Sequence, residues 1–538
     1  MDSDPIPVFR REPTTNEIAE AKAEIHVHEE EVAMLNGRIF SLQNQIISLK
    51  SEQAGHIRTI NKHKGVITLA RRIPPELLAR IFARCVKDGW YLAPVVVSCV
   101  CSQWREAARS PRVWSRLYLN LEDANAVGRA QFWLRMASNA PLHIHLIASR
   151  MISAHSLLRT MGILLHHASE WRTLTMEVET LRNVSLVSLC LKQAAMQFLK
   201  LKRISIKSQP RFEADLDDGI DEIIDFATVL SPNNAPNLMQ LFLTCNAVPT
   251  TMIFPSRIHN LSLAITESSL IRPLSARSIT SLLVSLPHLT SLDLSMPLEY
   301  AGEYVDDGEL EGATLPRLVS LTLHGPTNMN GLLCHLHAPS LRRLRLRSIE
   351  DKGFRQDPIG PSLLRFIRRS EGYLSNFPLE VFELYDIDLS PDCFASCFSS
   401  LPNLRELRLH ESSISDATVR LLQAGFFDQE ASGCLCPKLT KIDFRWCANL
   451  TGQAVVDLVR SRVPTAFMGS LPPFLMPGQF IGSDDAIAYP INEVAILNCC
   501  YVLEQDILDL ARMTLCRVVV EESDHCGELC YSSRYYLD

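Results

Sequence analysis

Three patterns of apolar spacing divide the chain. Between residues 16 and 63, apolar side chains recur every seven residues, with a second set three residues after the first. Between 69 and 119 they follow short amphipathic helices, and from 120 to 538 a short strand-like pattern returns many times. We therefore expect an α/β protein with a disordered N-terminus (1–15), a coiled-coil helix (16–63), a small helical module (69–119) and a repeat solenoid (120–538).

The first pattern is a heptad repeat. Isoleucine or valine at position a with leucine at position d, as in Val32 to Leu49, favours a two-stranded parallel coiled coil. A homodimer through this helix is one expectation, and a single helix that folds back on its own chain is the other. The a positions are Ile18, Ile25, Val32, Ile39, Ile46, Gln53 and Ile60, and the d positions are Ala21, His28, Leu35, Leu42, Leu49, His56 and His63.

The strand-like pattern is that of a leucine-rich repeat. Leu238-x-x-Leu241-x-Leu243-x-x-Asn246 matches the repeat's strand motif in full. Further copies begin at Leu289, Leu318, Leu341 and Leu404, and looser ones at Trp171, Leu201, Ile258, Leu379, Leu439 and Ile491. In six copies a proline stands two residues before the first apolar position and is predicted to end a helix and start the strand. These prolines are Pro236, Pro287, Pro316, Pro339, Pro402 and Pro437.

The spacers between strands predict helices at 278–286, 362–370, 416–425 and 453–462. One strand and one helix per unit, stacked side by side, give a curved leucine-rich repeat solenoid with a parallel sheet on its concave face. The Pro- and Gly-rich stretch 463–490 is predicted to be a long insertion. The acidic stretches 213–225 and 299–311 are predicted to be solvent-exposed.

Side chains that alternate with the leucines face away from the core, and the basic ones are concentrated in the later strands. Because a planar guanidinium can bind carboxylate or phosphate with two hydrogen bonds, one hypothesis is that this face grips an acidic or phosphorylated segment of a target protein. The alternative is a solvated charged face with no specific ligand. The residues concerned are Arg343, Arg345, Arg347, Arg408, Lys441 and Arg445.

Composition narrows the class of protein. The chain has 538 residues, 47% of them hydrophobic, and a net charge of −7, which gives no overall footprint for nucleic acid. No run reaches the roughly 18 to 20 apolar residues that span a bilayer, so no membrane partner is expected. Sixteen scattered cysteines without a secretory signal indicate reduced thiols, as in the cytoplasm or nucleus.

Motifs of catalysis and metal binding are missing from the sequence. It has no Walker-type loop, no GxGxxG after a strand and no GxSxG elbow. The cysteine groups lack the paired two-residue spacing of zinc sites, so no metal or cofactor is expected. These groups are Cys434-x-Cys436, Cys499-Cys500 and His525-Cys526-x-x-x-Cys530.

Residues 71–119 carry a distinctive order of motifs. Pro74-Pro75 suits a helix start, and Glu76 lies in the first turn, where the helix dipole favours a carboxylate. A second helix is predicted from about Val95 to Ala108, with Trp114 and Leu117 folding back over the pair. The order is Ile73-Pro74-Pro75-Glu76-Leu77-Leu78, then Ile81-Phe82, Cys101-x-x-Trp104-Arg105 and Pro111-x-x-Trp114.

This order resembles an F-box, the helical module that docks onto the Skp-type adaptor of a cullin ubiquitin ligase. With the repeats, the chain resembles fungal-type F-box proteins with a degenerate leucine-rich repeat region, and the segment from Asp443 to Thr451 is similar to their cysteine-containing repeat subtype. The family's usual Leu-Pro opening is Ile73-Pro74 here. By this resemblance the adaptor-facing or supporting residues are Pro74, Pro75, Leu77, Leu78, Ile81, Phe82 and Trp104.

The resemblance implies a non-catalytic, substrate-recognition subunit. Other subunits of the ligase would carry out the ubiquitin chemistry, and this chain would supply proximity to a target protein whose identity the sequence does not encode. The alternative is an interaction scaffold that dimerises through the coiled coil and never joins a ligase. A third class, a hydrolase or transferase, has no motif in its favour.

Overall fold

The computed structural model divides the chain into two units. The helical unit comprises Met1–Phe82 and Val95–Ala108, and the sheet unit comprises Ala83–Pro94 and Arg109–Asp538. The residues that the structure describes are 12–67, 72–149, 152–193, 198–208, 233–245, 254–265, 276–295, 312–325, 329–348, 359–371, 377–425, 434–463 and 488–519.

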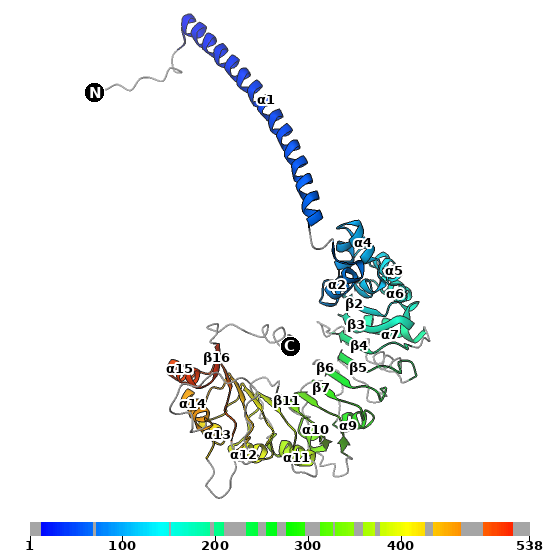
Figure 1. The fold of residues 1–538 in the computed structure, drawn as a ribbon, viewed down its shortest axis with the longest axis vertical. Coiled ribbons are helices and arrows are strands. Elements are labelled where there is room, and N and C mark those ends of the chain that lie inside the picture. The colour runs from blue at the N-terminus through cyan, green and yellow to red at the C-terminus, as the bar shows by residue number, and fades with distance from the viewer. Residues whose placement is uncertain are drawn as a thin grey trace, which may run out of the picture. The chain divides into compact units, whose positions relative to one another are not determined.

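One long helix, α1 (Thr15–Ile67), covers the predicted heptad region (Figure 1). It opens with a capping box, in which the Thr14 amide donates to Glu17 Oε2 at 2.8 Å and the Glu17 amide donates to Thr14 Oγ1 at 3.4 Å. The helix has 53 residues and so is about 80 Å long. Its apolar heptad side chains, including Ile25, Leu35 and Leu49, are exposed. Dimerisation through them stays a prediction.

Three short helices follow: α2 (Pro75–Lys87), α3 (Ala93–Ser98) and α4 (Ser102–Ala108). The prediction of one helix from Val95 to Ala108 is wrong, because the helix is interrupted between Ser98 and Ser102. A run of β-branched valines favours helix weakly, and at the end of α3 the Arg105 Nε donates to the Ser98 carbonyl at 2.9 Å.

The sheet unit contains a parallel sheet of fourteen strands, so the predicted mixed α/β architecture with a many-stranded parallel sheet is confirmed. Its order is β1-β2-β3-β4-β5-β6-β7-β9-β11-β12-β13-β14-β15-β16, while β8 (Ala313–Thr314) and β10 (Leu336–His337) form a separate pair. The strands are β1 (Arg116–Asn120), β2 (Leu142–Ala148), β3 (Trp171–Val178), β4 (Arg203–Ser208), β5 (Gln240–Cys245), β6 (Asn260–Ile265), β7 (Ser291–Ser295), β9 (Ser320–His324), β11 (Arg343–Arg347), β12 (Val381–Tyr385), β13 (Glu406–His410), β14 (Lys441–Arg445), β15 (Glu493–Leu497) and β16 (Leu515–Val519).

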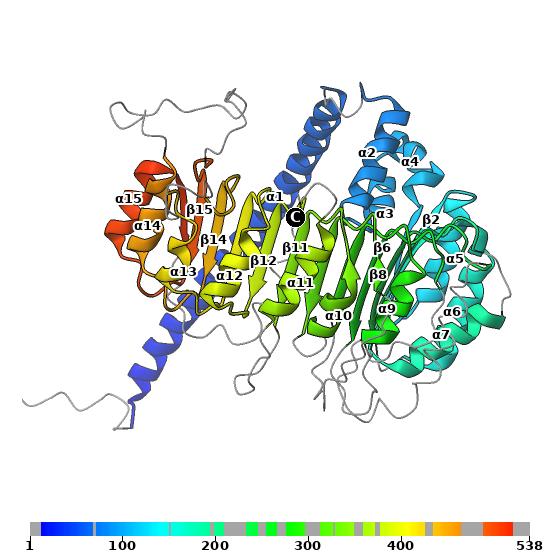
Figure 2. The ribbon, with the colours of Figure 1, turned by 90° about the horizontal axis from the view of Figure 1, so that it is seen from below.

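Helices connect many of the strands and lie on one face of the sheet (Figures 1 and 2). The core lies between them and the sheet, where alternate leucines such as Leu292, Leu321 and Leu344 are buried. We call the opposite face the outward face. The helices are α5 (Ala126–Ala137), α6 (Ala154–Leu165), α7 (Leu181–Gln193), α9 (Ala276–Val284), α10 (Met329–His335), α11 (Gly360–Ser370), α12 (Pro391–Phe398), α13 (Asp416–Arg420), α14 (Gly452–Ser461) and α15 (Glu504–Met513).

The six prolines that precede the strands have a more specific role than the predicted one. In each case the first apolar residue of the motif donates its backbone N–H to the carbonyl of the residue before the proline, at 3.0 to 3.2 Å. Proline at the second position of such a turn already has the required φ. The donor–acceptor pairs are Leu238–Ala235, Leu289–Leu286, Leu318–Leu315, Leu341–Ala338, Leu404–Leu401 and Leu439–Cys436.

Trp114 and Leu117 lie in the sheet unit. The Trp114 ring lies 4.9 Å from that of Trp133 and 5.3 Å from that of Phe132, both on α5, and Leu117 is buried in β1. Several predictions fall outside the described residues: 1–11 of the N-terminus, the acidic stretches 213–225 and 299–311, residues 464–487 of the insertion, Asn246, His525, Cys526 and Cys530.

Candidate functional site

The predicted adaptor residues separate into a buried and an exposed group. Leu78 and Phe82 are 2% and 3% exposed, and the Phe82 ring packs 5.1 Å from Trp104. Leu77 and Ile81 are each 46% exposed and lie one turn apart on α2. Leu78, Phe82 and Trp104 therefore hold the helices together, whereas Leu77 and Ile81 are available to a partner. Pro74 and Pro75 lie exposed at the start of α2.

Sequence reasoning did not include three further exposed apolar side chains of the helical unit in this set. Val95 and Val96 on α3 are exposed, as is Val100 after it, while Val97 is buried. The sequence signal was the run Val95-Val96-Val97, because three successive residues of a helix cannot all face the same core. The helical unit thus exposes Leu77, Ile81, Val95, Val96 and Val100 to solvent.

The outward face is organised in rows, because each strand of the sheet pairs in parallel with its neighbours; the register shifts between β2 and β3. Residue Arg345 on β11 pairs with Glu383 on β12, which pairs with Arg408 on β13, which pairs with Asp443 on β14. Charges of opposite sign therefore alternate along this row. The six basic residues predicted to bind a target lie on β11, β13 and β14.

Glu383 is the centre of an ion-pair cluster. Its carboxylate is 1% exposed and accepts hydrogen bonds at Oε1 from Arg347 Nη2 at 2.6 Å and Nε at 3.1 Å. Its Oε2 lies 3.4 Å from Arg345 Nε and 3.6 Å from Arg408 Nη1. Burial opposes ionisation of Glu383, but Arg347, with further help from His410 and Arg345, outweighs burial and holds the pKa below its usual range.

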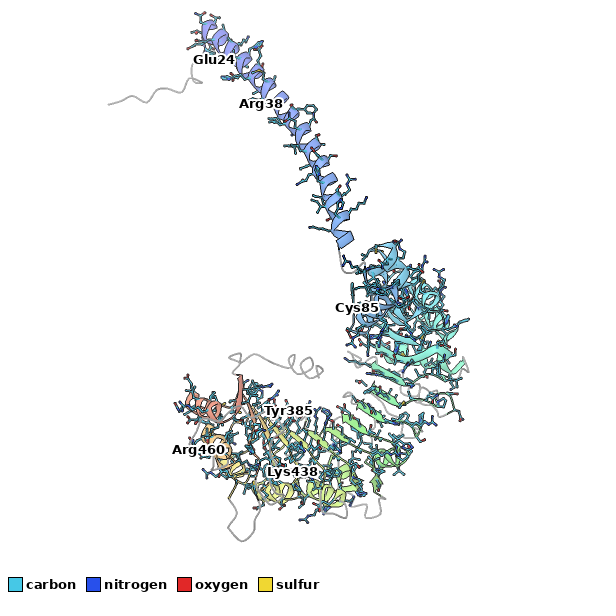
Figure 3. The ribbon with its side chains drawn as sticks, in the orientation of Figure 1. Glu24, Arg38, Cys85, Tyr385, Lys438 and Arg460 are labelled. Carbon is cyan, nitrogen blue, oxygen red and sulfur yellow. The ribbon has the colours of Figure 1, made fainter. Side chains whose placement is uncertain are left out.

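The remaining basic residues have carboxylate partners as well, with one exception. Arg445 donates from Nη2 to Asp443 Oδ2 at 2.7 Å, and Lys441 Nζ lies 2.9 Å from Glu493 Oε2. Arg343 makes no ion pair with the described residues. The positive charge that sequence reasoning assigned to this region is therefore largely neutralised within it. Figure 3 shows Tyr385 on the strand side of this region and Arg460 on the helix side.

A second basic region, which sequence reasoning did not single out, surrounds a hollow of about 610 Å³ at the amino ends of the first strands. Its cations are Arg116, Arg172, Lys202 and Arg203. The signal for Arg116 and Arg203 was present in the sequence, since both occupy outward positions of strands before residue 240. The other lining residues are Tyr91, Leu117, His143, Ile144, His145, Thr173, Thr175, Met239, Gln240, His259, Asn260 and Thr290.

The cysteines that were considered as metal ligands have structural surroundings. Cys436 and Cys499 are both buried, and their thiols donate to the carbonyls of Phe398 at 3.5 Å and Phe444 at 3.8 Å. Among the described residues, no group of three His, Cys, Asp or Glu side chains could hold a metal ion. None of the described helices is both long enough and apolar enough to cross a membrane.

Comparison with solved structures gives only distant likenesses. The yeast Rad7–Elc1 complex is 14% identical, with 74% of this chain and 95% of that chain covered and a TM-score of 0.36. A Bacteroides fragilis protein is 18% identical over 49% and 64%, with a TM-score of 0.29. The complex of TLR13 with ssRNA13 is 12% identical over 65% and 50%, with a TM-score of 0.24. Scores below 0.5 do not establish a common fold.

Comparison of the sequence itself gives a local match. No curated protein matches the chain. The model of the F-box-like family matches residues 70–120, the segment that contains α2, α3, α4 and the exposed Leu77 and Ile81. Residues 70–120 of this chain are therefore an F-box-like domain.

Proposed function

We propose that this chain is the substrate-recognition subunit of a Skp-cullin-F-box type ubiquitin ligase. The F-box-like domain would dock the Skp-type adaptor, and a fungal-type, degenerate leucine-rich repeat region would bind a target protein in the cytoplasm or nucleus. The observation that carries the proposal is that a segment matching the F-box-like family leaves Leu77 and Ile81 exposed on α2.

Exposed apolar side chains give this docking its driving force. Burying a leucine or isoleucine side chain fully contributes about 1.5–3 kcal/mol, and half-exposed side chains contribute part of that. Leu77 and Ile81, joined by Val95, Val96 and Val100, would thus supply several kcal/mol to an interface. Charged partners on the adaptor would add specificity more than affinity.

The chain would contribute proximity and no chemistry of its own. Holding a target near a ubiquitin-charged enzyme converts a bimolecular encounter into an effectively intramolecular one. The outward face, with its rows of polar and charged side chains on a rigid sheet, is the surface suited to hold the target.

Co-purification of the full chain with the Skp-type adaptor tests the proposal. Wild type should retain the adaptor, and Leu77→Asp/Ile81→Asp should lose it, because two carboxylates would be desolvated in the interface. Leu158→Asp/Leu508→Asp is the matched control, since these leucines are comparably exposed on α6 and α15 of the sheet unit. Failure of wild type to bind, or equal loss in the control, would contradict the proposal.

A second candidate function is a scaffold that dimerises through α1 and joins no ligase. The exposed heptad side chains of this helix favour dimerisation, because an isolated helix gains little from leaving Ile25, Val32 and Leu42 in water. Sedimentation of the full chain, compared with Val32→Lys/Leu42→Lys, measures it. A wild-type dimer that fails to bind the adaptor would favour the scaffold, and an adaptor-bound dimer would favour a dimeric ligase subunit.

A further inference from the structure

The hollow at the amino ends of the first strands is strongly basic. Arg116, Arg172, Lys202 and Arg203 line it, and none of the lining residues that the structure describes is Asp or Glu. These four cations make no ion pair with any carboxylate among the described residues. The nearby acidic groups have other partners, since Glu170 pairs with Lys200 at 2.6 Å and Glu177 lies 3.3 Å from His145.

The strand order gathers these cations although they are distant in sequence. Arg116, His143, Thr173 and Arg203 occupy the same row of the outward face on β1 to β4. Neighbouring strands are about 4.8 Å apart, so the row brings the two arginines to within about 15 Å. Arg172 is the extra residue in a register shift, where Leu142 pairs with Trp171 and His143 pairs with Thr173. Such an irregularity redirects a side chain, and this one lines the hollow.

The pKa of His143 reflects its burial and the positive charges around the hollow. Burial, followed by the charges of Arg116 and Arg172, lowers its pKa from 6.5 to about 4. Its Nδ1 lies 3.0 Å from Thr173 Oγ1. A neutral imidazole among unpaired cations indicates a site that lacks negative charge.

The aromatic side chains nearby are already in contact with other groups of the protein. Tyr91 stacks on Tyr118 at 4.7 Å, His145 meets Tyr118 edge-on at 5.1 Å, and the Arg203 guanidinium covers the Phe242 ring at 4.6 Å. Sites for single-stranded nucleic acid offer free aromatic faces on which bases stack. The arrangement here favours an anionic group on a protein over a nucleic acid.

We propose that this hollow binds a phosphorylated segment of the target protein, with Arg116, Arg172, Lys202 and Arg203 contacting the phosphate and the acidic residues beside it. A phosphate monoester carries a charge near −2 and three strong acceptor oxygens, which match several unpaired guanidinium donors better than one carboxylate does. The volume falls within the range of sites that enclose a small group. This inference rests on the proposed function, in which the sheet unit binds the target.

Binding of a degenerate phosphoserine and phosphothreonine peptide pool to the full chain tests the inference, with the unphosphorylated pool beside it. Arg172→Glu/Arg203→Glu should weaken binding of the phosphorylated pool more than about tenfold, because two charge-assisted contacts become repulsive. Arg343→Glu tests β11 as the rival site for the same ligand: Arg343 occupies the same row as Arg203, is exposed, and lies outside the hollow. Arg172→Gln/Arg203→Gln removes the two charges without reversing them. Weaker binding of the phosphorylated pool by this variant, with thermal unfolding as in wild type, excludes loss of fold as the cause.

Equal binding of both pools, no binding, or equal loss in Arg343→Glu would overturn the inference. Inorganic phosphate or an oligouridine RNA bound as tightly as the phosphorylated pool would overturn it as well, in favour of a free-ion or nucleic-acid site. Adaptor co-purification on the same samples separates the two proposals. If the full chain retains the adaptor but does not prefer the phosphorylated pool, only the phosphate site is contradicted. If it prefers the phosphorylated pool but does not retain the adaptor, only the docking is contradicted.

Discussion

Arg347 on β11 and Glu383 on the neighbouring strand β12 share a 2.6 Å ion pair, although 36 positions separate them in the chain. Glu383 also lies within 4 Å of Arg345 and Arg408, so one buried carboxylate is in contact with three guanidinium groups. This cluster explains why the arginines of β11 do not form a wholly unpaired basic surface. It also yields the first prediction.

Glu383→Gln should lower the free energy of unfolding by about 2–3 kcal/mol. Removing one partner of a buried ion pair costs up to about 3–5 kcal/mol, and the partial exposure of the arginines reduces that figure. Glu380→Gln is the control, because its pair with Arg342 at 3.3 Å is exposed and contributes about 0.5 kcal/mol or less. Urea unfolding measures both, and equal effects would contradict the cluster's role.

Acid should lower the stability of the region around Glu383 and Asp443. Burial opposes ionisation of Asp443, but His410 and Arg445 outweigh it and lower its pKa from 3.8 to about 2, and the pKa of Glu383 is also below its usual 4.5. A carboxyl group with a lowered folded-state pKa stabilises the fold fully above its unfolded value, and this contribution is lost as the pH falls through the folded value. The loss should therefore begin below about pH 4.5 and continue toward about pH 2.

The double variant Glu383→Gln/Asp443→Asn isolates this effect. Its free energy of unfolding should change less than that of wild type between about pH 6 and about pH 3, since neither side chain can then take up a proton. Urea titrations at the two pH values make the comparison. An unchanged pH dependence would show that other carboxylates govern acid stability.

His143 should respond at a higher pH than these carboxyl groups. Its lowered folded-state pKa means that the unfolded chain binds the proton more strongly, so stability decreases as the pH falls from 6.5 to about 4. Arg116→Gln should raise this pKa, but not to 6.5, because burial is the larger cause. NMR titration of the imidazole measures it, and a pKa unchanged in Arg116→Gln would remove Arg116 as a cause.

Arg462 holds the turn before β14 in place. It is 2% exposed and donates to the carbonyls of Leu422 at 2.7 Å, Leu435 at 2.8 Å and Cys436 at 3.1 Å. Arg462→Met should cost about 2–4 kcal/mol, because several buried carbonyls lose their donor. Arg460→Met, two residues earlier, removes only an exposed pair with Asp457 and should cost about 0.5 kcal/mol or less. Similar losses in the two variants would contradict this account.

Leu78 and Leu77 should separate stability from docking. Leu78→Ala opens a cavity in the helical unit and should lower stability by about 2–4 kcal/mol, whereas Leu77→Ala should change it by about 0.5 kcal/mol or less. Thermal unfolding measures the stability of both variants. Adaptor co-purification measures docking, which Leu77→Ala should weaken. If Leu77→Ala destabilised the unit as much as Leu78→Ala, its side chain would belong to the core.

The sequence predicted what depends on local periodicity. Leu344 was placed correctly in a buried strand position because its neighbours at every second residue follow the same rule. The Arg347–Glu383 pair was not predictable in that way, since it depends on the register between two strands joined by a long connection. Arg172 was missed because its position arises from a register shift that no apolar pattern encodes.

The helical unit shows the same division. The start of α2 at Pro75 followed from the geometry of proline, but the break after Ser98 depends on the side chain of Arg105, which reaches back to a carbonyl. The adaptor set was predicted as one group, and only the packing of Phe82 on Trp104 separates its supporting members from its exposed ones.

The parallel pairing of neighbouring strands along the sheet has an evolutionary consequence. Gain or loss of one whole strand-and-helix unit would preserve the hydrogen-bonded ladder and yet change which side chains are neighbours in a row. Deleting the unit that carries β2, for example, would set Arg116 directly beside Thr173 and contract the spacing of the cations. A lineage could thus retune what this surface recognises by copying units, without altering a single codon within them.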